Sequence, residues 1–157
     1  MKKDDSELFE KMHIAGKLAA RTLDELTPFV KPGVTTNFLD KICYEYIRDH
    51  GGNSAPLYYK GFPKSCCTST NHIVCHGIPS EKVLKDGDIM NVDVTAFINE
   101  HHGDTGRMFC IGDVSVKSKN LISTTYESMM RAISIIKPGT KLGDIGATIQ
   151  DLSLIHI

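Results

Sequence analysis

Two aspartates, Asp93 and Asp104, interrupt apolar stretches of the sequence and could do chemistry together. They lie in two alternating runs of β-branched, aromatic and polar residues, 89–97 and 102–111, which is the pattern of a β-hairpin. A turn centred on residues 98–99 would place Asp93 directly opposite Asp104, on one face of the ladder. The sequence therefore predicts a pair of buried carboxylates.

Carboxylates at directly opposed positions repel, because their Cβ atoms lie only about 4.5–5.5 Å apart. A shared proton, an arginine or a divalent metal ion could compensate them. Arg107 is an odd number of residues from Asp104 and is expected on the other face, so we favour a metal ion. The alternative is that the aspartates only end a strand and cap a turn. Both stand where a sequence selected for stability alone would place Val or Ile, which favours function.

A histidine, His76, ends the apolar run 73–75 and is followed by Gly77 and Pro79, which predict a tight turn around it. A single histidine is usually a surface or core residue. Beside a carboxylate pair it becomes a candidate metal ligand or general acid/base. The neighbouring Cys75 is not expected to form a catalytic couple with it, since adjacent residues of an extended segment point to opposite sides.

Composition limits the classes of function. The chain has 157 residues, a net charge of −1 and 24% charged residues, which gives no basic field for nucleic acid. Residues 1–21 contain no apolar segment long enough for a signal peptide or membrane span. Five cysteines without a C-x-x-C pair do not suggest a thiolate zinc site. We therefore expect a cytoplasmic protein without direct nucleic-acid or membrane binding.

Helical periodicity predicts three amphipathic helices, at about 6–28, 36–50 and 118–136. Between the second helix and the hairpin, residues 53–79 mix aromatic, Gly, Pro and hydroxyl residues, which is typical of short strands and functional loops. The helices are expected to support the hairpin that holds the two aspartates.

The sequence also contains an internal repeat. V-K-P-G-V-T-T at residues 30–36 reappears as I-K-P-G-T-K at 136–141, each time between two amphipathic helices. This predicts one incomplete domain at 1–151, with a first repeat at about 6–113 and the start of a second at about 117–151. The last six residues, 152–157, match the translation of a transposon end sequence used in preparing sequencing libraries, and are expected to be a non-native tail.

Three motifs closely resemble type I methionine aminopeptidases: C-H-G-I-P at 75–79, K-D-G-D-I-M-N-V-D-V-T at 85–95 and H-G-D-T-G-R-M-F at 102–109. The resemblance extends from about Leu8 to Gln150 and corresponds to the N-terminal portion of the family. It implies an α/β (α+β) pita-bread fold, in which two pseudo-symmetric halves surround a curved, mainly antiparallel sheet. Here the second repeat is expected to be truncated early.

The resemblance also implies roles for the three candidate residues. Asp93 would bind one divalent ion through both oxygens, and Asp104 would bridge two ions, of Mn, Fe, Co or Zn. His76 would be a catalytic residue that hydrogen-bonds the substrate amide without binding metal.

Two further sites follow from the same resemblance. Tyr59, Phe62 and Cys67 match positions that line the pocket for the N-terminal methionine side chain. Asn71 and the carbonyl of Ile73 match a site for a monovalent cation.

The chain departs from the family in two ways. Gly106 stands where the family usually has Ser or another small polar residue. The third metal histidine and the two metal glutamates of the family have no counterpart, because Asp144, Asp151 and His156 are in the wrong context. The chain as given is therefore expected to be an incomplete, inactive fragment.

The predicted function is a metal-dependent aminopeptidase that removes the N-terminal methionine of nascent peptides near the ribosome, through a water activated by two metal ions. The full-length form is expected to be a monomer. Two alternatives stay open. A non-catalytic pita-bread binding protein is disfavoured by the intact Asp93, Asp104 and His76, and a proline-specific aminopeptidase relative is disfavoured by the C-H-G-I-P motif.

Overall fold

A computed structural model describes residues 5–156 of the chain. Residues 1–4 and 157, which the predicted domain and tail include, lie outside the described part. The chain divides between Asp113 and Val114 into two compact units, which are described separately. The predicted extents of the domain and of the tail stay predictions.

Two helices of the first unit form where apolar residues recur at helical spacing. Helix α1 (Ser6–Leu26) is followed by a short 3-10 helix, η1 (Thr27–Phe29), because Pro28 cannot continue the α-helical hydrogen-bond pattern. Helix α2 (Thr36–Asp49) begins where the Thr35 hydroxyl accepts a hydrogen bond from Phe38 N at 3.2 Å. The two predicted helices are confirmed to within two residues at each end.

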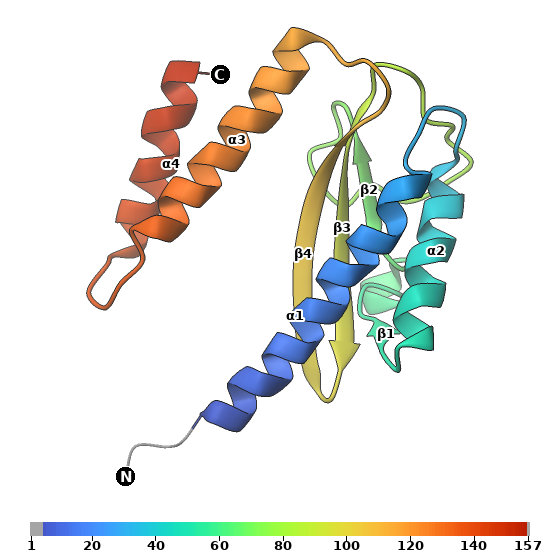
Figure 1. Ribbon diagram of the computed structural model, residues 1–157, viewed down its shortest axis with the longest axis horizontal. Coiled ribbons are helices and arrows are strands. Elements are labelled where there is room, and N and C mark those ends of the chain that lie inside the picture. The colour runs from blue at the N-terminus through green and yellow to red at the C-terminus, as the bar shows by residue number, and fades with distance from the viewer. Residues whose placement is uncertain (1–4, 157) are drawn as a thin grey trace. The chain divides into compact units, whose positions relative to one another are not determined.

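The remaining elements of this unit are β1 (Asn53–Ser54), the 3-10 helix η2 (Tyr59–Gly61), β2 (Cys67–Thr70), β3 (Ile89–Ile98) and β4 (His101–Cys110). All strand pairs are antiparallel. Strand β3 is central: β4 runs along one side of it, and β2 and β1 follow each other along the other side (Figure 1). Both predicted hairpin strands are confirmed to within one residue.

The predicted register of the hairpin is wrong by two residues. Asp93 pairs with Gly106, and Asp104 pairs with Thr95. The turn residues are Asn99 and Glu100, both with positive φ (52° and 63°), as the favoured two-residue hairpin turns require. Because the slip is even, both aspartates still lie on the same face, as diagonal neighbours.

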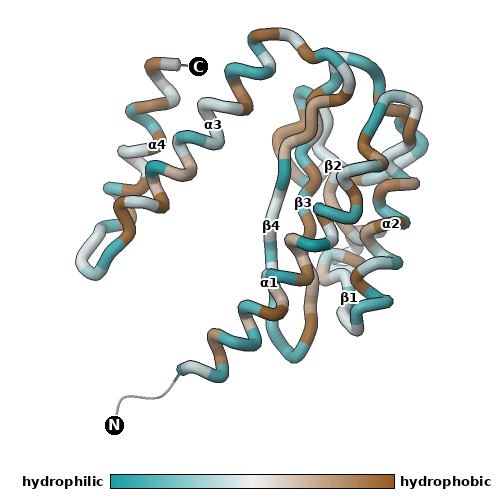
Figure 2. The backbone as a smooth tube through the Cα atoms, viewed as in Figure 1, coloured by the Kyte–Doolittle hydropathy of each residue, from teal (hydrophilic) through white to brown (hydrophobic). Residues whose placement is uncertain are grey.

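The other face of the sheet packs on the helices. Residues of β3 alternate between half-buried and buried, and the buried set joins apolar residues of α1 and α2 in one core. The strand contributes Met90, Val92, Val94 and Ala96, and the helices contribute Leu18, Ala19, Leu23, Leu26, Leu39, Cys43 and Ile47. Figure 2 shows that hydrophobic residues recur between hydrophilic ones along α1. The helices thus hold the ladder from behind and leave the face with the aspartates, the site face, to form a cleft.

The second unit contains α3 (Val116–Ser134) and α4 (Leu142–His156). Between them Gly139 has a φ of 93°, as Gly33 has a φ of 90° between α1 and α2. The sequence repeat is therefore also a repeat of helix, turn and helix. Helix α3 begins two residues earlier than predicted, because the Ser115 hydroxyl accepts from Ser118 N at 3.1 Å. It also ends two residues earlier than predicted.

Among the described helices, none is both long enough and apolar enough to cross a membrane.

Candidate active site

A cleft of about 830 Å³ opens over the site face of the sheet. Its floor includes Asp93, Thr95 and Asp104 from the β3–β4 ladder. Six of the residues that line the cleft were singled out from the sequence: Tyr59, Phe62, Cys67, His76, Asp93 and Asp104.

One wall of the cleft is the β1–β2 loop, residues 55–66. Strand β1 pairs with residues 96–97 of β3 and β2 pairs with residues 90–93, so the connecting chain must leave the sheet and return to it. The loop closes on itself where Tyr58 N donates to Phe62 O at 2.7 Å. This excursion carries the side chains of Tyr59 and Phe62 to the cleft.

Asp40 of α2 fixes the point where this loop re-enters the sheet. Its Oδ1 accepts hydrogen bonds from Ser65 N at 2.7 Å and Cys66 N at 3.1 Å, and its side chain is buried. The next residue, Cys67, begins β2 and is the register partner of Asp93. Sequence reasoning missed Asp40, and the signal was an acidic residue within the apolar stripe of its helix.

The two aspartates differ in environment. Asp93 is half-buried, whereas Asp104 is exposed, so the expectation that both are buried is wrong for Asp104. Burial raises the pKa of Asp93, and the charge of Asp104 and a hydrogen bond with it raise this pKa further, while His76 opposes the rise. Thr95 Oγ1 donates to Asp104 Oδ1 at 3.1 Å. The carboxyl groups are thus close enough to need a proton or a cation between them.

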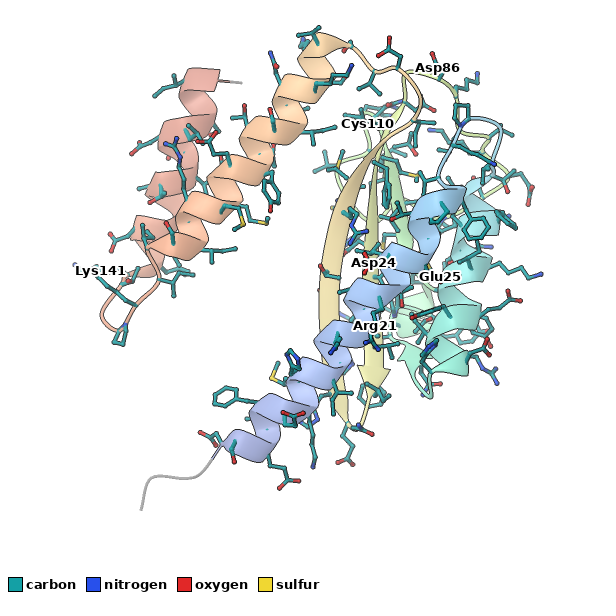
Figure 3. The ribbon with its side chains drawn as sticks, viewed as in Figure 1. Arg21, Asp24, Glu25, Asp86, Cys110 and Lys141 are labelled. Atoms are coloured by element: carbon teal, nitrogen blue, oxygen red, sulfur yellow. The ribbon has the colours of Figure 1, made fainter. Side chains whose placement is uncertain are left out.

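Arg107 does not supply that cation. Its side chain lies on the opposite face, where Nη2 is 2.8 Å from Asp24 Oδ1 and Nη1 donates to Thr27 Oγ1 at 3.0 Å. Figure 3 shows Asp24 on α1, which packs on that face. The prediction from residue parity is confirmed.

His76 reaches the cleft from a tight turn beside β2. Its backbone has a φ of 56°, and the next residue, Gly77, donates to Ser69 Oγ at 3.1 Å and accepts from Thr68 N at 2.8 Å. A Cβ on Gly77 would stand 2.3 Å from the Thr68 carbonyl oxygen, so only glycine fits there. The turn therefore aims His76 at the carboxylates.

Cys67 presents a neutral sulfur to the cleft. Burial, and then the charge of Asp93, raise the pKa of its thiol to about 11. At neutral pH the group is thus a small, polarisable and uncharged surface.

Asn71 and Ile73 do not line this cleft. The Asn71 side chain is held outside it, since Nδ2 donates to Asp88 Oδ1 at 2.8 Å and Oδ1 accepts from Ile89 N at 3.0 Å. Its carboxamide thereby joins the segment after β2 to the start of β3.

Comparison with known proteins gives this cleft a context. The family model described as metallopeptidase family M24 matches residues 10–153. The chain belongs to metallopeptidase family M24.

Within M24, the chain is similar to the methionine aminopeptidase of Rickettsia prowazekii, with 56% identity over 148 residues that cover 94% of this chain and 57% of the relative. The crystal structure of that protein superposes with a TM-score of 0.94 at 55% identity and covers 96% of this chain and 61% of that one. An Xaa-Pro dipeptidase from Bacillus anthracis shares the fold alone, with a TM-score of 0.81 at 22% identity, over 98% of this chain and 41% of that one. The predicted pita-bread fold is confirmed, and the chain spans about three-fifths of the length of the Rickettsia relative.

M24 enzymes are metallopeptidases, and the donor atoms of the cleft suit divalent metal ions. Asp93 and Asp104 offer carboxylate oxygens whose mutual repulsion a cation would relieve. Among the side chains that the structure describes, however, no group of three or more His, Cys, Asp or Glu is arranged to hold a metal ion. The described part of this M24 chain therefore fits a portion of a metal site.

Two residues of the M24 cleft with ionisable side chains, His102 and Lys60, were not predicted from the sequence. His102 lies two residues from Asp104 on the site face and packs against Phe97, with ring centroids 4.7 Å apart. Lys60 lies in the β1–β2 loop next to Tyr59. The parity of His102 with Asp104 was a usable signal, whereas nothing in the sequence indicated that Lys60 faces the cleft.

Proposed function

We propose that this chain supplies part of the active site of a methionine aminopeptidase, which hydrolyses the bond after the N-terminal methionine of nascent peptides. The observation that supports this most directly is the convergence of Asp93, Asp104 and His76 with Cys67 and two aromatic residues in one cleft. The high identity to the Rickettsia methionine aminopeptidase supports the same substrate. We place the reaction in the cytoplasm, near the ribosome, and expect a monomer.

Asp93 and Asp104 would hold two divalent ions, of Mn, Fe, Co or Zn, together with further ligands that the described residues do not provide. When bound, such ions supply an activated water and a Lewis acid for the scissile carbonyl. The half-buried position of Asp93 limits competition from bulk water for its carboxylate. Thr95 orients Asp104 through the hydroxyl bond to Oδ1.

His76 would act on the substrate itself. Its position in the same cleft lets the imidazole donate a hydrogen bond to the peptide amide and pass a proton to the departing amine. The tight turn at Gly77 restricts the backbone next to His76, so little ordering is needed when the substrate binds.

Tyr59, Phe62 and Cys67 would form the pocket for the methionine side chain. Two aromatic rings and a protonated thiol give an apolar, polarisable surface, which suits a thioether. A positively charged side chain on the N-terminal residue would lose its hydration there without gaining a partner among these three residues.

A monovalent cation would bind near Asn71 and Ile73. Because the Asn71 carboxamide is occupied by Asp88 and Ile89, we assign the cation to the main-chain carbonyls of Asn71 and Ile73. Such a cation would stabilise the turn that leads to His76.

The test uses two proteins, the product of the full reading frame that encodes this chain and the 157-residue chain alone. We expect the former to release methionine from Met-Ala-Ser when Mn²⁺ or Co²⁺ is added and to lose activity with a chelator. With two carboxylate ligands, the chain alone is expected to bind metal weakly and not to turn over.

The same assay separates the alternatives. Hydrolysis of Xaa-Pro peptides in preference to Met-Ala-Ser would indicate a proline-specific enzyme. Peptide binding without hydrolysis under every metal condition would indicate a binding protein, and either result would refute the proposal.

A further inference from the structure

Lys60 is the only lysine or arginine among the described residues that line the cleft. Within the described part of the chain, its ammonium group forms no ion pair with a carboxylate, including Asp93 and Asp104. Its neighbour is the ring of Tyr59, whose centroid lies 5.4 Å from Nζ. The cleft thus contains a cation that no carboxylate of the described residues neutralises.

The backbone around Lys60 is strained. Tyr58 and Lys60 have φ values of 68° and 48°, a region that side-chain-bearing residues rarely adopt. The loop is held in this form by hydrogen bonds from Gly61 N to Tyr58 O at 3.3 Å and from Phe62 N to Tyr59 O at 2.9 Å. A strained segment in the wall of a cleft points to a function for the side chains it presents.

We propose that Lys60 selects peptides with an acidic residue downstream of the scissile bond. This rests on the proposed function, because that function fixes which end of the peptide enters the cleft. In that orientation the N-terminus of the peptide lies at Asp93 and Asp104, and its methionine side chain lies in the proposed methionine pocket. The rest of the peptide then leaves the cleft past the β1–β2 loop. The free ammonium group in that wall would attract a carboxylate of the departing chain.

The experiment compares peptides that differ only in charge. The set is Met-Ala followed by Ser-rich sequence with Asp, Asn or Lys placed at the third, fourth or fifth position. In the product of the full reading frame, we expect kcat/KM at low salt to be about 2–5-fold higher for Asp than for Asn at one of these positions, the range of an exposed ion pair. The preference should fall as salt is raised.

Three variants make the test specific to Lys60. Lys60→Gln should remove the preference for Asp, and Lys60→Glu should reverse it in favour of Lys. Lys17→Glu makes the same charge change on α1, which covers the opposite face of the sheet, and should leave the preference intact.

Failure of this inference can be told apart from failure of the proposed function. If Met-Ala-Asn is hydrolysed but Asp gives no advantage, or Lys17→Glu removes the advantage equally, the role of Lys60 is refuted. If no peptide is hydrolysed, the anisotropy of labelled peptides still decides: a Kd about 2–5-fold lower for Asp that depends on Lys60 supports the inference, and equal Kd values overturn it.

Discussion

Gly103 of β4 lies against the backbone of Ala15 in α1, so closely that a Cβ added to Gly103 would stand 2.1 Å from the Ala15 carbonyl carbon. Gly103 separates His102 from Asp104, so this contact sets how near the helix approaches the strand that bears the carboxylate. Gly103, the first glycine of the H-G-D-T-G-R-M-F motif, therefore serves the packing of α1 on the face of the sheet opposite the aspartates.

We expect Gly103→Ala to lower the free energy of unfolding by about 1–3 kcal/mol or more, because neither backbone can move without disturbing the core. Urea unfolding of the full reading-frame product would measure it. Gly106→Ala is the matched control, since its new Cβ would lie 3.4–3.5 Å from its nearest atoms, in ordinary contact. Equal stability of the two variants would contradict the close approach.

Removal of either carboxylate should weaken metal binding. Asp93→Asn and Asp104→Asn are each expected to raise the Kd for Mn²⁺ at least about tenfold, because even outer partners of metal ligands cost that much. Arg107→Met, on the opposite face, should leave the Kd unchanged. Calorimetric titration measures all three, and an unaltered Kd in both aspartate variants would exclude them as ligands.

His76→Ala should affect turnover and leave metal affinity unchanged. The expected loss in kcat is about 10²–10⁴-fold, the usual contribution of a general acid or base. Steady-state kinetics on Met-Ala-Ser and a metal titration of the same variant separate the two effects. A large rise in the metal Kd would show instead that His76 is a ligand.

The raised pKa of Cys67 predicts slow alkylation. With a thiol pKa of about 11, the reactive thiolate is scarce at pH 8 and increases about tenfold with each unit of pH up to that value. Iodoacetamide should therefore modify exposed Cys75 and Cys110 first, as peptide mass mapping would show. Asp93→Asn should accelerate the modification of Cys67, since it removes a charge that raises this pKa.

The hydrogen bond from the Asn71 side chain to Asp88 makes the stability of the fold depend on pH. Burial alone would raise the pKa of Asp88, but hydrogen bonds from Asn71 Nδ2 and Lys85 N lower it below its ordinary value. A lowered folded-state pKa gives stability that is present above the unfolded-state value, near 4, and is lost as pH falls through the folded-state value.

Asn71→Ala should therefore destabilise the protein by about 0.5–1.5 kcal/mol at pH 7, and by less as the pH falls through the folded-state pKa of Asp88 and its carboxyl is protonated. Unfolding midpoints measured from pH 7 downward give the difference. The control Thr125→Ala removes an exposed hydrogen bond to the main-chain carbonyl of Leu121, which does not titrate, and a matching pH dependence there would contradict the assignment to Asp88.

The sequence was sufficient to find the hairpin and the face that carries both aspartates, but not the register. Alternation of residue types determines which side chains share a face, so Asp93 and Asp104 were correctly grouped and Arg107 was correctly excluded. The register depends on the turn, and Glu100 at a φ of 63° is not a residue that signals such a turn. The error of two residues therefore kept both aspartates on one face but assigned each the wrong partner on the opposite strand.

Other parts of the site depend on contacts between segments distant in the sequence. Asp40 is 25 residues from Ser65, whose N–H it accepts, and Gly103 is needed only because α1 crosses behind it. The position of Asp40 in the apolar stripe of its helix signals only that it is unusual, and neither contact partner can be found locally, because each contact depends on the approach of two elements. Lys60 was missed for a different reason, since its direction follows from the backbone conformation of its own loop.

The β1–β2 loop begins and ends at strands paired with β3, and Asp40 binds its end from behind. Its interior can therefore change in length or chemistry without shifting the floor on which the carboxylates stand. Such a segment behaves as an exchangeable cassette: its length and side chains can vary while the strands that carry Asp93 and Asp104 keep their pairing.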